Sequence, residues 1–140
     1  MNYKYFENAE AKSFAMKIAL HNKSDKLLSV YILQFIGESN DVLMYVSYAD
    51  NFEIANIKTF VLISKCDFDP LKQHNNPYTL NFIYTVKQYR RNKNALNMLN
   101  YIKNKHQLTA FCSPCNADLF MKCKYIKKGS MFDNIIFRSS

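Results

Sequence analysis

The sequence predicts an α+β fold class, an α/β sandwich-like single domain in which helices flank a mixed, mostly antiparallel sheet. The first third of the chain repeats apolar residues at helical spacing, whereas the middle is rich in β-branched and aromatic residues that alternate with the period of strands. Of the 140 residues, 49% are hydrophobic and 15% aromatic, which excludes a disordered tail, a collagen-like fibre and a coiled coil. We therefore expect residues 1–140 to form one domain.

The N-terminal segment predicts one strand and two helices. Tyr3–Phe6 alternates weakly and is expected to form a short strand. Asn8 is a favourable N-cap for a helix over Ala9–His21, whose apolar residues recur at helical spacing (Ala11, Phe14, Ala15, Ile18 and Ala19). A second helix is expected over Asp25–Ile36, with Asp25 as its cap and Gly37 as its stop. The core of this segment is also compatible with a strand, but its length and the glycine favour the helix.

From Asp41 onward the apolar period becomes that of strands. Val42–Ala49 and Ile57–Cys66 are expected to be antiparallel strands, with a turn at Asp50-Asn51 between them. Asp67–Pro77 has the composition of a loop. Thr79–Val86 is a third strand, and alternation places one set of its residues on a common face (Leu80, Phe82, Tyr84 and Val86).

The C-terminal part alternates helices and strands. Asn94–Lys105 has helical spacing, and Leu108–Phe111 is a short strand. Ser113 followed by Pro114 is expected to open a helix that continues to about Cys123. Two strands close the chain, Tyr125–Ile126 and Met131–Arg138, joined at Lys128-Gly129. We expect the sheet to splay after the strand Thr79–Val86, where the helix beginning near Asn94 leaves it.

The net charge of +8 is unevenly distributed. Residues 1–86 carry 8 basic and 9 acidic side chains, whereas residues 87–140 carry 11 basic and 2 acidic ones. The second half therefore favours an anionic partner, although a solvated lysine-rich face is an alternative interpretation. No segment has the apolar length of a signal peptide or a membrane span, so we expect an intracellular protein, in the cytoplasm or nucleus. The abundance of Asn and Lys together with only 2 Gly is typical of an AT-rich genome and suggests a viral source as a hypothesis.

Two stretches carry a resemblance to a known family. The first stretch, Val86–Ala95, begins at the end of an expected strand and contains Arg90, Lys93 and Ala95. Apolar residues at helical spacing come after it. The segment Phe120–Tyr125 comes at the end of the next expected helix. In order and spacing, the chain resembles the GNAT superfamily of acyl-CoA N-acyltransferases from about Asp41 to Phe137. The family places Arg/Gln-x-x-Gly-x-Gly/Ala at the first stretch, so Lys93 stands where the family has its first glycine.

The resemblance implies an acetyl-CoA site in the loop before the third helix. A loop that enters a helix N-terminus directs unpaired backbone N–H groups at one point, where a pyrophosphate fits. Basic side chains beside it add charge-assisted hydrogen bonds. The candidate cofactor-binding residues are Gln88, Tyr89, Arg90, Arg91, Asn92, Lys93, Asn94 and Ala95.

The resemblance also bears on catalysis. The family places a tyrosine in the penultimate helix that protonates the leaving thiolate, but here Phe120 occupies that position and has no proton to give. Tyr125 matches a core aromatic of the following strand. For a general base the sequence offers Asp67, Asp69 and His74 without distinctive spacing, so no catalytic residue is assigned. We expect a divergent acetyl-CoA-dependent N-acetyltransferase of weak or absent activity; the alternative is a non-catalytic structural or interaction protein of the same fold, with a protein partner.

Two further classes remain open. Cys112, Cys115 and Cys123, with His106, could supply zinc ligands, but one helix would hold the last two cysteines about 12 Å apart, and we therefore assign no metal site. Cys66 is expected to be a buried thiol. Lys87, Arg90, Arg91 and Lys93 interleave with Tyr84 and Tyr89, a pattern that could pair phosphate contacts with base stacking, although no nucleic-acid-binding motif accompanies it.

Overall fold

A computed structural model describes residues 2–38, 41–65, 78–131 and 134–139. The described elements follow the predicted order of strands and helices. They are β1 (Asn2–Glu7), α1 (Asn8–His21), α2 (Lys26–Ile36), β2 (Val42–Tyr48), η1 (Ile54–Asn56), β3 (Ile57–Lys65), β4 (Tyr78–Thr85), η2 (Lys87–Tyr89), α3 (Asn94–Lys103), β5 (Leu108–Cys112), η3 (Pro114–Asn116), α4 (Ala117–Lys122), β6 (Ile126–Met131) and β7 (Asn134–Arg138). The predicted loop Asp67–Pro77 lies outside the described residues.

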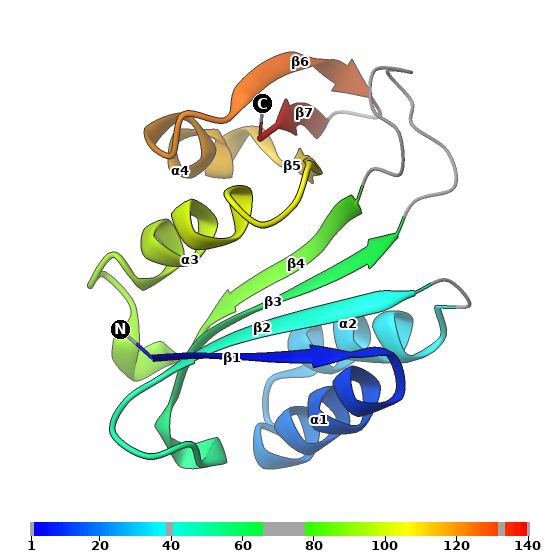
Figure 1. Ribbon diagram of the computed structural model, residues 1–140, viewed down its shortest axis with the longest axis vertical. Helices are drawn as coiled ribbons and strands as arrows, with labels where there is room; N and C mark the ends of the chain where they lie inside the picture. The colour runs from blue at the N-terminus through cyan, green and yellow to red at the C-terminus, as the bar shows by residue number, and fades with distance from the viewer. Residues whose placement is uncertain (1, 39–40, 66–77, 132–133, 140) are drawn as a thin grey trace.

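Among the described residues, seven strands form one sheet in the order β1-β2-β3-β4-β5-β7-β6. The pair β4–β5 is parallel and the other pairs are antiparallel, which confirms a mixed, mostly antiparallel sheet. The parallel pairing joins only Tyr78, Thr79 and Leu80 to β5, whereas β4 stays paired with β3 as far as Thr85. The two strands therefore diverge halfway along β4, and this confirms that the sheet splays there (Figure 1).

Helices cover both faces of the sheet and bury a separate core on each. Figure 1 shows α1 and α2 on one side of strands β1–β4, with α3 and α4 on the other. The first core joins α1 and α2 to residues such as Met44, Phe60 and Leu62. The second joins α3 and α4 to residues of alternate register, such as Val61 and Ile63. This alternation explains why the central strands β2 and β3 read as nearly continuous apolar runs.

Two N-terminal predictions differ from the structure. Asn8 does not cap α1; its Oδ1 instead accepts a hydrogen bond of 3.2 Å from the backbone N–H of Val42, and Asn8 itself has a φ of 47°. Gly37 ends α2 as expected, but with a φ of −77°, so its helix stop does not use the left-handed conformation. The predicted cap of α2 is confirmed, because Asp25 Oδ1 accepts from the Leu28 N–H at 3.1 Å.

Two further corrections concern strand faces and a turn. Leu80 does not share a face with Phe82: the register pairs Ile63 with Leu80 but Leu62 with Phe82, so Asn81 is an extra residue that reverses the alternation. Lys128-Gly129 is not a turn, because β6 continues through it with a bulge in its pairing to β7.

The chain after β5 also begins its helix differently from the prediction. Ser113 makes no capping hydrogen bond to a backbone N–H, and Pro114–Asn116 forms a turn of 3-10 helix before α4 starts at Ala117. None of the described helices has both the length and the apolar character needed to cross a membrane.

Candidate functional site

Two adjoining cavities open where β4 and β5 diverge. The first, of about 450 Å³, lies against the loop before α3. The second, of about 520 Å³, lies between β4 on one side and β5 with α4 on the other. Both are lined by Thr85, Ala95 and Leu119, so they form parts of one cleft.

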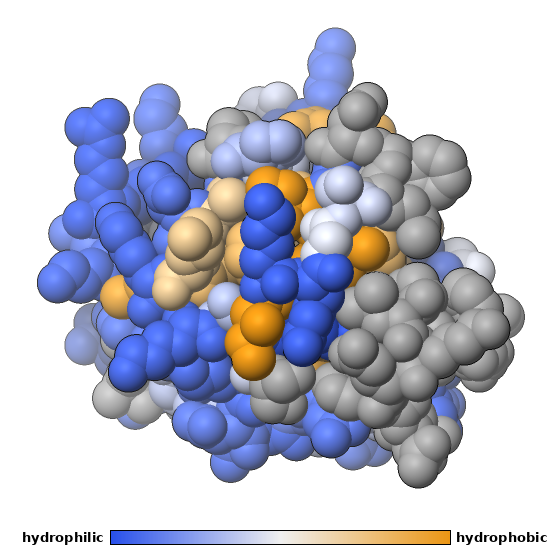
Figure 2. Space-filling model, turned by 90° about the horizontal axis from the view of Figure 1, so that it is seen from above, coloured by the Kyte–Doolittle hydropathy of each residue, from blue (hydrophilic) through white to orange (hydrophobic). Residues whose placement is uncertain are grey.

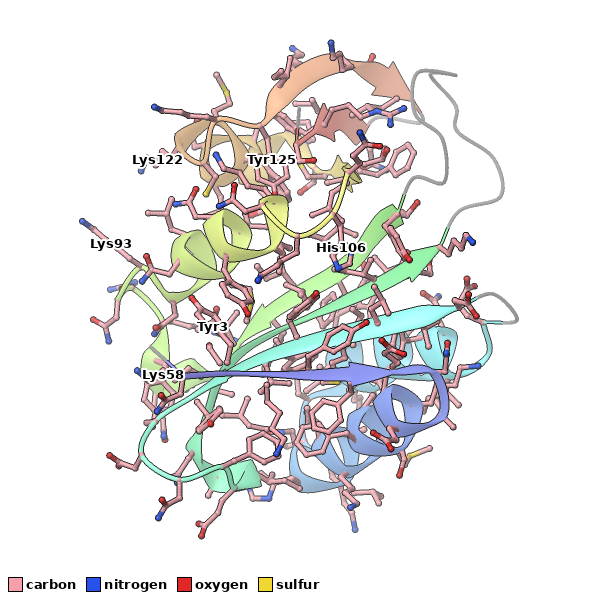
Figure 3. The ribbon with its side chains drawn as sticks, viewed as in Figure 1. Tyr3, Lys58, Lys93, His106, Lys122 and Tyr125 are labelled. Atoms are coloured by element: carbon pink, nitrogen blue, oxygen red, sulfur yellow. The ribbon has the colours of Figure 1, made fainter. Side chains whose placement is uncertain are left out.

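The first cavity is strongly basic. Its lining includes Arg90, Arg91, Lys93 and Lys122, and none of the described residues that line it is acidic. In Figure 3, Lys93 and Lys122 extend from the same side of the molecule, one from the loop before α3 and the other from α4. Lys122 is the basic residue that sequence reasoning missed, because only the packing of α4 beside α3 brings it to this loop.

Six of the eight predicted cofactor-binding residues line the basic cavity: Tyr89, Arg90, Arg91, Lys93, Asn94 and Ala95. The other two do not. Gln88 lines a separate cavity against α1 and η1, and Asn92 is exposed outside both. The structure thus places most of the predicted loop around one hollow at the N-terminus of α3.

The loop reproduces a glycine-like backbone without glycine. Lys93, at the N-cap of α3, has a φ of 61°, and Arg91 has a φ of 69°. Both lie in the left-handed region, which costs a residue with a Cβ about 1–2 kcal/mol. Asn94 fixes the turn, since its buried side chain donates to the carbonyl oxygen of Tyr89 at 2.8 Å. Lys93 therefore has, at the start of α3, a backbone conformation that glycine adopts more readily.

This strain gives a test. We expect Lys93→Gly to raise the free energy of unfolding by about 0.5–1 kcal/mol, because relief of the left-handed strain exceeds the added flexibility of the unfolded chain. Lys87→Gly is the control, because it removes the same kind of side chain from the same loop at a residue without positive φ. This variant should lower the free energy of unfolding by a similar amount. Urea denaturation measures both; changes of the same sign in the two variants would contradict the assigned backbone.

The side chain of Arg90 is fixed by contacts with the end of β4. Its Nε donates to the carbonyl oxygen of Thr85 at 2.9 Å, and its guanidinium lies 5.4 Å from the ring centre of Tyr84. Tyr84 in turn donates to Asp25 Oδ2 at 2.9 Å, which links the loop to the start of α2. The pKa of Asp25 is lowered, first by the Leu28 N–H and then by the Tyr84 hydroxyl. Arg91, Lys93 and Lys122 are therefore the more available cations of the cavity.

The second cavity combines apolar walls with a bulged strand edge. Asn81, the extra residue of β4, lines it together with Phe82, Phe111 and Phe120. Its side-chain amide donates to Ser64 Oγ at 2.8 Å, while the bulge leaves its backbone outside the β3–β4 ladder. A smaller hollow of about 170 Å³ adjoins this cavity through Tyr31, Asn81 and Phe82, and Glu38 is among its lining residues.

Phe120 and Tyr125 both lie in the core, but only Phe120 lines the cavity. The Phe120 ring stacks on Phe137 with 5.3 Å between centroids. The buried hydroxyl of Tyr125 donates to the carbonyl oxygen of Leu99 at 3.0 Å, and burial raises its pKa. Tyr125 therefore holds α3 against the C-terminal strands, as its predicted core role implies. The candidate bases Asp67, Asp69 and His74 lie outside the described residues, as does Cys66.

The cysteines and the histidine considered as alternative zinc ligands lie in different surroundings. Cys112 lines the second cavity, while the Cys123 thiol contacts the carbonyl oxygen of Leu96 at 3.4 Å and has its pKa raised by burial. His106 pairs with Tyr45 instead: the Tyr45 hydroxyl lies 2.8 Å from His106 Nε2. Over the described ranges, no three His, Cys, Asp or Glu residues come close enough to hold a metal ion. The side chain of Cys115 lies outside the described part of the structure.

The His106–Tyr45 contact predicts a pH dependence of stability. Burial, and then Lys105, lower the pKa of His106, so the folded chain binds fewer protons than the unfolded chain at mildly acidic pH. Stability should therefore fall as the pH drops below about 6.5, the ordinary histidine value. His106→Gln keeps an acceptor for Tyr45 but does not titrate, and its melting temperature should fall less between pH 7 and pH 5. Parallel pH profiles of wild type and variant would contradict this.

No protein-family model and no curated protein sequence matches this chain. Its fold, however, matches solved structures. One of them is the structure described as histone acetyltransferase HPA2 and related acetyltransferase, from Corynebacterium glutamicum. It matches this chain with a TM-score of 0.63 and 13% sequence identity, and the match covers 99% of this chain and 96% of that one. NAA60 of Arabidopsis thaliana, in complex with acetyl-CoA, has a TM-score of 0.60 at 10% identity, over 98% and 97% of the two chains. The chain has the GNAT fold.

A third solved structure with the GNAT fold is a predicted acetyltransferase from Clostridium acetobutylicum with acetyl-CoA. Its TM-score is 0.58 at 16% identity, and the match covers 94% of both chains. The predicted fold class is thereby confirmed over nearly the whole chain, including the two N-terminal helices that lie before the stretch on which the resemblance was based. These similar proteins come from a plant and from bacteria, and the viral source stays a hypothesis.

Proposed function

We propose that this protein binds acetyl-CoA in the cleft between β4 and β5 and is an N-acetyltransferase of low activity. The observation that carries the proposal is the continuity of a basic hollow at the α3 N-terminus with an apolar gap between two diverging strands. CoA has the same division, since it joins a phosphorylated nucleotide to an extended chain that ends in a thiol. Two similar structures that contain acetyl-CoA support the choice of ligand.

The phosphates would lie in the basic hollow. The first amides of a helix have no partner within it, so those of Asn94, Ala95 and Leu96 are free of helical bonds and lie at the positive end of the helix dipole. The left-handed turn at Lys93 gives the loop a backbone conformation that glycine usually supplies, while the lysine side chain adds a cation. Arg91, Lys93 and Lys122 then supply cations around the pyrophosphate.

The extended arm of CoA would follow the edge of β4. Beyond Leu80 the side of β4 that faces β5 has no strand partner within the described part of the chain, so its backbone N–H and C=O groups need other partners. The arm carries two amide groups and can pair with such an edge much as an added strand does. The apolar walls, including Phe82 and Leu119, suit its methylene and dimethyl groups.

The acyl group would then lie near the bulge at Asn81. A backbone N–H released by a bulge can stabilise negative charge on the thioester oxygen when an amine nitrogen attacks the carbonyl carbon. The C–S bond breaks, the amine loses a proton and the CoA thiolate gains one. Phe120 supplies no proton to that thiolate, so we expect turnover to be slow. Because the reaction consumes acetyl-CoA, the proposal keeps the expected intracellular location, cytoplasm or nucleus.

The melting temperature with and without acetyl-CoA tests the proposal. At 100 times its dissociation constant a ligand adds about 2.7 kcal/mol to the free energy of unfolding, which raises the melting temperature of a domain of this size by several degrees. Free CoA should stabilise similarly, and pantetheine, which lacks the phosphates, far less. The absence of any shift with acetyl-CoA or CoA would contradict the proposal.

A non-catalytic protein of the same fold is the second candidate, and the phenylalanine at position 120 is what favours it. On this alternative the basic cavity binds another anionic partner. The nucleic-acid interpretation is less well supported, because Tyr84 is half-buried and engaged by Asp25 rather than available to stack on a base. Stabilisation by CoA with no detectable transfer to any amine would favour the non-catalytic candidate over the enzyme.

A further inference from the structure

Helix α2 carries apolar residues on two sides, although only one of these sides is buried. Leu28, Ile32 and Phe35 pack into the core, whereas Leu27, Val30 and Leu33 on the other side are 65%, 50% and 61% exposed. Tyr31, at 37% exposure, extends this surface, which we call the α2 face. A surface helix normally carries mostly polar residues on its outer side, so several exposed apolar side chains there indicate an interaction surface.

We propose that the α2 face joins two copies of this chain, with their α2 helices antiparallel across a two-fold axis. The four apolar side chains of the α2 face expose on the order of 400 Å² per chain, comparable with the largest apolar patch on a typical monomer. A standard interface buries about 800 Å² on each partner, with an apolar core and a polar rim. The α2 face supplies that core, and the polar residues beside it supply the rim.

The charges at the ends of α2 fit the antiparallel arrangement. Lys26 is the charged residue of the helix itself and stands at its start, while Glu38 lies just after its end. The helix is about 16 Å long by its rise per residue, so a parallel pairing would bring the two Lys26 side chains together. The antiparallel pairing instead sets each Lys26 beside the Glu38 of the other copy and beside the negative end of its helix dipole.

The distribution of charge favours a second copy over a lipid surface. Residues 1–86, which include α1 and α2, have one more acidic than basic side chain, whereas the positive excess lies in residues 87–140. Exposed lysines gather at the α4 and β6 end (Lys122, Lys124, Lys127 and Lys128), where hydrophilic side chains cover much of the surface in Figure 2. An anionic membrane would therefore attract another part of the molecule than the α2 face.

The dimer would also border the cleft. Leu27 and Tyr31 belong to the α2 face and line the cavity between β4 and β5 as well. The second copy would thus form part of the entrance on the α2 side. Dimerisation through the α2 face does not require any particular ligand in the cleft, so its test is independent of acetyl-CoA binding.

Sedimentation equilibrium of the full chain over a range of concentrations tests the proposal. The wild type should approach twice its monomer mass of 16.5 kDa. Val30→Lys combined with Leu33→Lys should remain monomeric and folded. Ile126→Lys, which places the same charge at an exposed apolar site of β6, should still dimerise. A wild type that is monomeric throughout, or a dimer that persists in the double variant, would overturn the proposal.

A charge exchange tests the antiparallel geometry. Lys26→Glu should raise the dimer dissociation constant about tenfold, because both ion pairs become repulsive. Adding Glu38→Lys to this variant should restore the wild-type value. If the second substitution does not restore dimerisation, or if the wild type instead co-floats with anionic vesicles through Val30 and Leu33, the assignment of the α2 face to a second copy is wrong.

Discussion

Replacing Phe120 with tyrosine is expected to raise the rate of acetyl transfer by about 100- to 10,000-fold, the usual contribution of a general acid. Phe120 lines the cavity in which the thioester would lie, and Tyr differs from Phe by one oxygen atom. The ring is held by stacking on Phe137 and by an edge contact with Tyr125, so the new hydroxyl extends from a fixed ring. The thiolate would then leave as a thiol rather than as an anion.

The measurement is the release of CoA from acetyl-CoA in the presence of a mixture of primary amines, followed by chromatography. Phe52→Tyr makes the same chemical change in the connection before η1, away from the cleft, and should leave the rate unaltered. Thermal unfolding shows whether Phe120→Tyr keeps the fold. A wild type that already transfers acetyl groups rapidly, with no gain in Phe120→Tyr, would mean that position 120 is not the acid position of this chain.

The second large effect concerns the basic cavity. The triple variant Arg91→Gln, Lys93→Gln and Lys122→Gln is expected to weaken CoA binding about 10- to 100-fold, because three partly exposed charge contacts are each worth up to about 1 kcal/mol. The affinity of the variant should also depend less on salt concentration, since fewer charges remain to be screened. Isothermal titration calorimetry at two ionic strengths measures both effects.

The matched control removes the same net charge elsewhere. Lys124→Gln, Lys127→Gln and Lys128→Gln change exposed residues that do not line the cleft, so the affinity should fall much less. Arg90→Ala separates a binding role from a structural one: its contacts with Thr85 and Tyr84 predict a loss of stability along with any loss of affinity. Equal losses of affinity in the two triple variants would show that net charge, and not the cavity, attracts CoA.

Much of the fold was predictable from the sequence because each helix and strand has its own local period. The spacing of Ala11, Ala15 and Ile18 predicts the buried side of α1, and all three are buried. The errors came from contacts between segments far apart in sequence. Asn8 accepts a hydrogen bond from Val42 of the neighbouring strand β2, and the extra residue Asn81 in β4 reverses the face of Leu80. Neither effect is visible in local periodicity.

The sequence predicted the part of the candidate site that lies in one continuous segment, and it did not predict the residues that distant segments contribute. The loop before α3 is continuous in sequence, so its basic residues could be found, and the left-handed backbone of Lys93 explains how the loop forms without glycine. Lys122 and Tyr31 reach the cleft from α4 and α2. Only the folded sheet brings these helices to the gap between β4 and β5, so no spacing in the sequence could have identified them.

Acetyl-CoA titration followed by amide NMR tests the central claim most directly. If CoA binds with its phosphates at the α3 N-terminus and its arm along β4, the backbone amides of Lys93, Asn94, Ala95 and Leu96 should show the largest shifts. Amides of β4 from Asn81 to Thr85 should follow. Large shifts confined to other elements, or no shifts at saturating acetyl-CoA, would contradict the proposed site.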